Sequence, residues 1–192
     1  MSLYDLVKFL HVLTAVFMAA PLYNLIVVNE RVRFGKAHLQ VDQYFENLIR
    51  SNAIRCYVYQ ATVLVTGVAL VALRGPMTSL YLNPVLLMKL VAFLLLTVFL
   101  SLVHFSIQPR IDASLAQAAG DSIPQPVAAV IGPLRLRRKR LAATCLFLVV
   151  TAVLLGLQVD ARFAPSLTAV LVAAVALFAW RVYRTRIPYG WV

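Results

Sequence analysis

Two ionisable residues inside apolar segments carry the chemistry that this sequence offers. Lys89 lies within an apolar stretch from Pro84 to about Phe105, and His11 lies within a first stretch of about residues 6–28. A charged group in hydrocarbon is costly unless it faces protein, water or a partner, so it indicates a functional site by default. The first and third segments run in the same direction, which places both groups about 8 Å below one surface. We therefore expect His11 and Lys89 to form one polar site.

A weaker candidate site centres on His104, which lies about 22 Å further along the helix axis than Lys89. We expect it near the opposite surface, within reach of four residues of the second segment: Arg55, Tyr57, Tyr59 and Gln60. An interfacial belt explains these residues, because Tyr and His are common at the headgroup boundary. The alternative is a second polar site, at the exit of a proton path or at a quinone or porphyrin edge. Because His11 and His104 lie at opposite depths, they are not expected to ligate one haem iron.

Membrane helices must position these residues. Hydrophobic residues make up 62% and charged residues 13% of the 192, and the mean hydropathy is +0.85, which is outside the range of soluble domains. The sequence predicts an all-α, polytopic membrane bundle that forms a single domain over residues 1–192. Five windows are long enough to span about 30 Å of hydrocarbon, and two longer polar connections separate them, about 29–53 and 107–140. The windows are about 6–28, 54–73, 84–106, 141–158 and 164–183.

The net charge of +11 is explained by topology, and we expect no nucleic-acid partner. The two long connections, the start of the second span and the tail carry most of the Lys and Arg residues, whereas the short connections hold only Arg74 and Arg162. By the positive-inside rule the N-terminus is outside and the C-terminus inside, in a bacterial inner membrane. The basic run from Arg135 to Arg140 is interpreted as a topology anchor, with an anionic-lipid site as the alternative. Asp42 and Glu46 are expected on a solvated amphipathic helix.

The remaining chemistry-bearing residues favour no further site. Cys56 and Cys145 lack C-x-x-C spacing and lie in a reducing compartment, so we interpret them as packing residues. No nucleotide-binding, metalloprotease or hydrolase motif occurs. Ligands for a metal would have to come from scattered side chains, and we predict no metal site.

Two stretches resemble a broad group of bacterial membrane proteins. They are "LVKFLHVLTAVFMAAPLYNLIVVNE" and "NPVLLMKLVAFLLLTVFLSLVHF", followed by "RLRRKRLAATCLFLVVTAVLLGL". The group includes HemJ-type protoporphyrinogen oxidases and CopD-type copper-resistance domains, and the resemblance covers about residues 1–158. It implies that His11 and Lys89 are the recurring polar pair, which HemJ-type proteins link to haem or porphyrin chemistry.

The chain also departs from that group. HemJ-type proteins usually have a histidine where this chain has Met88, and typically four spans instead of five; the further metal-binding side chains of CopD-type domains are missing. The leading hypothesis is an accessory subunit of a larger membrane redox complex that contacts haem b or quinone and is inactive alone. Its docking surface would be the fifth segment, where Ala169, Ala173, Ala174 and Ala176 suit close helix contacts. The alternatives are porphyrinogen oxidation with quinone as acceptor, and CopD-type metal-ion transport.

Overall fold

The chain folds as a bundle of long helices. The structure, a computed structural model, describes residues 2–31, 38–118, 120–159 and 163–184. Every regular element in these ranges is a helix. The elements are α1 (Leu3–Arg31), α2 (Leu39–Arg74), the short α3 (Ser79–Leu82), α4 (Pro84–Leu102), the π-helical turn η1 (Val103–Ile107), α5 (Gln108–Leu115), α6 (Gln125–Leu157) and α7 (Pro165–Arg184).

Five of the described helical segments are long and apolar enough to cross a membrane. They begin with α1, α2, α4, α6 and α7, which are the five segments predicted from the sequence. The prediction of an all-α bundle with five membrane-spanning helices is therefore confirmed, and the protein is a multi-pass membrane protein.

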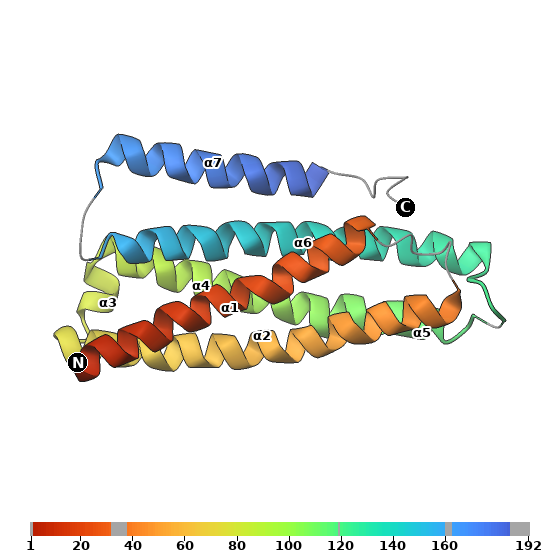
Figure 1. Cartoon of the computed structure of the whole chain (residues 1–192), viewed down its shortest axis with the longest axis horizontal. Coiled ribbons are helices and arrows are strands. Elements are labelled where there is room, and N and C mark those ends of the chain that lie inside the picture. The colour runs from red at the N-terminus through yellow and green to blue at the C-terminus, as the bar shows by residue number, and fades with distance from the viewer. Residues whose placement is uncertain (1, 32–37, 119, 160–162, 185–192) are drawn as a thin grey trace.

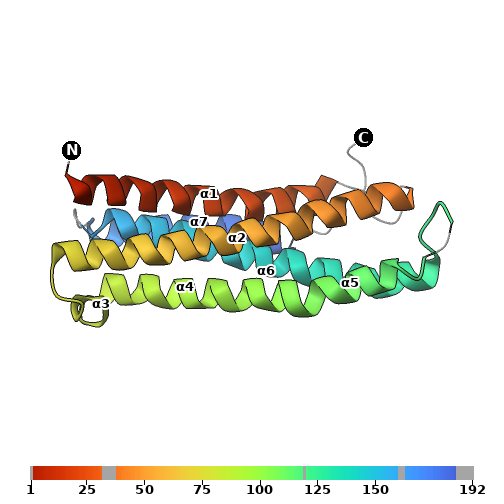
Figure 2. The same cartoon turned by 90° about the horizontal axis from the view of Figure 1, so that it is seen from below.

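Four of these helices form a ring, and the fifth lies outside it. α1 packs against α2 and α6, and α4 packs against α6 and more sparsely against α2. α2 and α6 therefore face each other across the ring. Among the long helices described, α6 is the one with which α7 makes substantial contacts. Figures 1 and 2 show α7 on the outer side of α6.

The helices continue well beyond the hydrocarbon. α2 has 36 residues and α6 has 33, which correspond to about 54 Å and 50 Å, against about 30 Å of hydrocarbon. The stretches 29–53 and 107–140, predicted as polar connections, are largely helical extensions of α2, η1, α5 and α6. They enclose a core of their own, because apolar side chains are spaced among the charges: Leu39, Ile107, Ile111, Leu115, Ile123 and Ile131.

Candidate functional site

His11 is fixed by α2. Its Nδ1 lies 2.9 Å from Thr66 Oγ1, and the Thr66 hydroxyl donates its single hydrogen to the Thr62 carbonyl at 2.6 Å. We infer that Thr66 Oγ1 accepts from the Nδ1–H of His11, which leaves the lone pair on Nε2. Gly67 makes the contact possible, because a Cβ at this position would lie 3.2 Å from His11 Cε1.

Lys89 reaches from α4 to the end of α6. A Cβ on Gly156 would lie 3.4 Å from the Lys89 Nζ, and α6 ends at the next residue, Leu157. The last carbonyls of a helix carry partial negative charge, so this position favours an ammonium. The structure thus supplies a physical reason why a half-buried lysine is tolerated here.

The two predicted partners lie at the same end of the bundle. His11 lies beside Gly67, near the end of α2, and Lys89 lies beside Gly156, at the end of α6. No carboxylate of the described residues forms an ion pair with Lys89. The two side chains therefore supply an amine and an imidazole at this end of the bundle.

The structure brings together two residues of the weaker predicted site, His104 and Gln60, and places Tyr59 elsewhere. His104 and Gln60 line one cavity of about 50 Å³ between α1, α2, α4 and α6, where Cys56 and Cys145 also lie. Gln60 accepts a hydrogen bond from Thr97 Oγ1 at 3.0 Å. Tyr59 is not among the lining residues and packs near Phe17 on α1, with ring centroids 6.4 Å apart.

His104 lies in the π-helical turn. The N–H of Gln108 bonds to the Val103 carbonyl, one residue further back than in an α-helix, and such bulges are frequent at functional sites. The ring stands edge-on to Tyr57, with centroids 5.7 Å apart. Its Nδ1 is buried and has no hydrogen-bond partner in the described part of the chain. A cavity of this size has room for a few water molecules.

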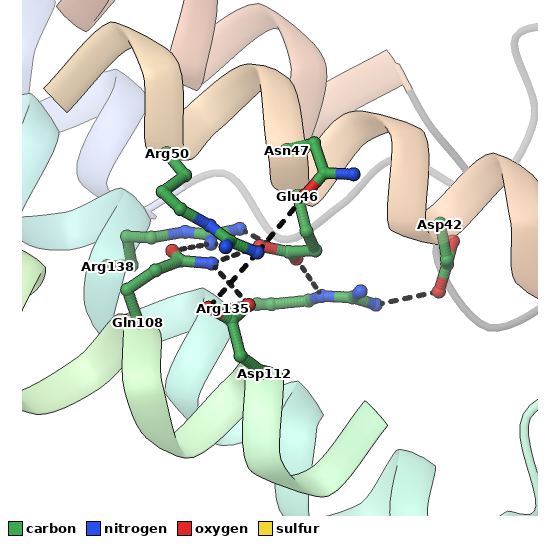
Figure 3. A network of polar contacts seen from close by, with 8 residues as sticks. All are labelled: Asp42, Glu46, Asn47, Arg50, Gln108, Asp112, Arg135 and Arg138. Carbon is green, nitrogen blue, oxygen red and sulfur yellow. Dashed lines mark hydrogen bonds and ion pairs between the residues drawn. The ribbon is translucent and has the colours of Figure 1, made fainter. Parts of the chain in front are cut away.

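A buried ion-pair network that the sequence did not predict joins the extensions of α2, α5 and α6 (Figure 3). Arg135 donates through Nε to Glu46 at 2.9 Å and through Nη1 to Asp42 at 3.1 Å. Arg138 donates to both oxygens of Glu46 and, at 2.6 Å, to Gln108 Oε1. Gln108 donates through Nε2 to Glu46 at 2.9 Å. All five side chains are buried.

This network corrects two interpretations of the sequence. Arg135 and Arg138 are 4% and 0% exposed, so they are internal ion-pair partners and not headgroup anchors. Asp42 and Glu46 are 0% and 2% exposed, so the prediction of a solvated helix face was wrong. The signal that could have found the network is the spacing: two carboxylates four residues apart and two arginines three residues apart each lie on one helix face.

Glu46 is the centre of the network. Burial alone would raise the pKa of its carboxyl, but the guanidinium groups of Arg138 and Arg135 and the amide of Gln108 hold that pKa below its ordinary value. The carboxylate is therefore ionised at neutral pH, and the network holds the three helix extensions together by charge-assisted hydrogen bonds.

The donor sets of the described residues are sparse. These residues contain no group of three or more His, Cys, Asp or Glu side chains that could hold a metal ion. His11 and Lys89 offer instead an imidazole nitrogen and an amine, which suit a ligand that carries an acidic or carbonyl oxygen.

No protein-family model, curated protein or solved structure matches this chain.

Proposed function

We propose that this chain is an accessory subunit of a larger redox complex in the bacterial inner membrane, with its N-terminus outside. In this proposal the His11–Lys89 site contacts a lipophilic cofactor or substrate of that complex, with haem b or a quinone as the candidates. The chain binds and positions the molecule, and a partner subunit supplies the reaction.

The proposal rests on Lys89, which lies at the end of the bundle opposite the buried ion-pair network. No carboxylate of the described residues forms an ion pair with it. The end of α6 offsets part of its cost, because a helix C-terminus stabilises a cation by about 0.3–1 kcal/mol. A charged lysine inside a span costs about 2.5–3.5 kcal/mol on insertion scales. The part of this cost that the end of α6 does not offset favours binding of an anionic or strongly hydrogen-bond-accepting group from outside the chain.

The donor and acceptor pattern narrows the class of that partner. Lys89 offers N–H donors, and His11 offers the Nε2 lone pair once its Nδ1–H is committed to Thr66. A carboxylic acid, such as a protonated porphyrin propionate, matches both groups, and so does a quinol hydroxyl, whereas a quinone oxygen can only accept from Lys89. Each of these molecules reaches the site from the bilayer.

A subunit role is supported by the outer helix. Few residues of α7 are buried. Among the long helices described, only α6 makes substantial contacts with α7. The rest of its surface, which includes Leu177 at 64% exposure, is apolar and available to lipid or to another membrane protein. The four small residues predicted to suit close helix contacts are all exposed: Ala169, Ala173, Ala174 and Ala176.

The test combines a visible absorption spectrum of the gently purified protein with identification of the chains that copurify. Lys89→Met and His11→Leu should reduce cofactor retention to a similar extent, and the double variant should be little worse than either, because both residues hold one ligand. The control is Lys8→Met, since Lys8 is an exposed lysine of α1 near the same end.

Two results would contradict the proposal. Additive losses in the double variant would mean that His11 and Lys89 are independent structural positions. Porphyrinogen oxidation by a partner-free preparation with quinone would establish an enzyme of HemJ type instead of a subunit.

A further inference from the structure

An apolar groove runs between α6 and α7. Its volume is about 260 Å³. Side chains of both helices line it, and all of them are apolar: Leu146, Phe147, Val150, Ala174, Val175, Phe178 and Ala179. The small side chains of Ala174 and Ala179 face the larger ones of α6 and leave this space unfilled.

One arginine lies on the same helix face as the groove. Arg140 precedes Phe147 by two helical turns and so lies on the same face of α6. Its guanidinium stands over the ring of Tyr183 on α7, with Cζ 5.1 Å from the ring centroid. Arg184 is stacked on Trp180 in the same way, at 4.8 Å, but this pair lies on another face of α7 from Phe178 and Ala179. Arginine and aromatic side chains together mark the headgroup level of a membrane.

The two guanidinium groups differ from those of the buried network. No carboxylate of the described residues forms an ion pair with Arg140 or Arg184. Both residues are exposed, in contrast to Arg135 and Arg138, whose charges are neutralised inside the bundle. Arg140, a cation without an ion-pair partner among the described residues, lies at one end of an apolar groove, which is complementary to an anionic head with an apolar tail.

The width of the groove distinguishes between possible occupants. A membrane helix is about 10–12 Å across, which is too wide for a space of about 260 Å³ between two packed helices. An acyl chain is one carbon wide and fills such a space along its length. Basic pockets between membrane helices at the headgroup level bind anionic lipids.

We propose that the α6–α7 groove binds one anionic phospholipid of the surrounding leaflet, with an acyl chain between the two helices and the phosphate on Arg140. The lipid would fill the gap that the small residues of α7 leave and so fix α7 against α6. This site is independent of the His11–Lys89 site.

The experiment uses Trp180 as the reporter. In a Trp191→Phe background Trp180 is the single tryptophan of the chain. The full-length protein in nonionic detergent micelles is titrated with phosphatidylglycerol that carries brominated acyl chains, which quench a nearby indole. Phosphatidylcholine with the same chains and soluble glycerol 3-phosphate are the comparison ligands.

We expect phosphatidylglycerol to quench at a lower concentration than phosphatidylcholine. Arg140→Gln should weaken this binding about fivefold, since one arginine near a lipid phosphate contributes about 1 kcal/mol. Arg137→Gln is the matched control, an exposed arginine of the same helix that contacts no described aromatic ring, and should leave the affinity unchanged. Ala174 lines the groove and is exposed, so Ala174→Leu should fill the groove without disturbing the helix packing. This variant should abolish the preference for phosphatidylglycerol.

Several outcomes would overturn the proposal. Equal quenching by both lipids, or equal losses in Arg140→Gln and Arg137→Gln, would mean diffuse attraction without a site. Competition by glycerol 3-phosphate at concentrations comparable to the lipid would indicate a phosphate site without a chain. Unchanged quenching in Ala174→Leu, which tests the groove even if Arg140→Gln misfolds, would exclude an acyl chain there.

Discussion

Arg138 offers the sharpest test of the buried network. Its side chain is fully buried and donates to Glu46 through two nitrogens and to Gln108 through one. Removal of one partner from a buried ion pair costs about 3–5 kcal/mol, because the other charge is left uncompensated. In Arg138→Met, Glu46 keeps its bonds to Arg135 and Gln108. We therefore expect a loss at the lower end of that range, about 3 kcal/mol in the free energy of unfolding.

The assay is reversible unfolding in mixed micelles of a mild detergent and SDS, followed by circular dichroism. Arg137→Met is the control, since Arg137 is the exposed neighbour in the same basic run, and it should change stability by less than about 0.5 kcal/mol. In the double variant Glu46→Met, Arg138→Met both charges of one pair are gone, so its loss should be smaller than the sum of the single losses. A loss in Arg138→Met no larger than in Arg137→Met would refute the reasoning, because it would show that the network contributes nothing to the fold.

The partners of Glu46 lower the pKa of its carboxyl from 4.5. The stability that Glu46 contributes is therefore present above pH 4.5 and is lost as the pH falls through the native pKa. In acid unfolding curves the stability difference between wild type and Glu46→Gln should shrink, and it would stay constant if Glu46 were unpaired. Gly67→Ala places a Cβ 3.2 Å from His11 Cε1, so NMR spectra of the imidazole should show a displaced ring while the thermal midpoint hardly changes, because alanine favours the helix; an unmoved ring would mean that the contact is loose. Reporter fusions at Gly75 should behave as periplasmic and fusions at Ala128 as cytoplasmic, and reversed signals would overturn the assigned orientation.

The membrane class and the five spans could be predicted from composition alone. Lipid leaves a chain few ways to satisfy its backbone polar groups, so an apolar run of sufficient length is a helix whatever surrounds it. The depth of Lys89 and His11 followed from the same rule, because residue number along a membrane helix measures distance from the surface.

The extensions outside the hydrocarbon could not be predicted in this way. In water, a segment that mixes charges with apolar residues can be a loop, a solvated helix or part of a packed core. Asp42 and Glu46 appeared solvated because their partners, Arg135 and Arg138, lie about 90 residues away in the chain. Their burial is a property of the pairing, since neither set would be buried without the other.

The sequence by itself determined which residues are unusual in this protein, and the tertiary structure decided what each of them faces. Lys89 and His11 are conspicuous in the sequence because ionisable groups are costly in lipid. Gly156, Gly67 and Thr66 are inconspicuous there, and they define the site by letting the two side chains approach α6 and α2. Contacts of this kind depend on the rotation of each helix about its axis, which is set by packing against several neighbours at once and not by any one segment.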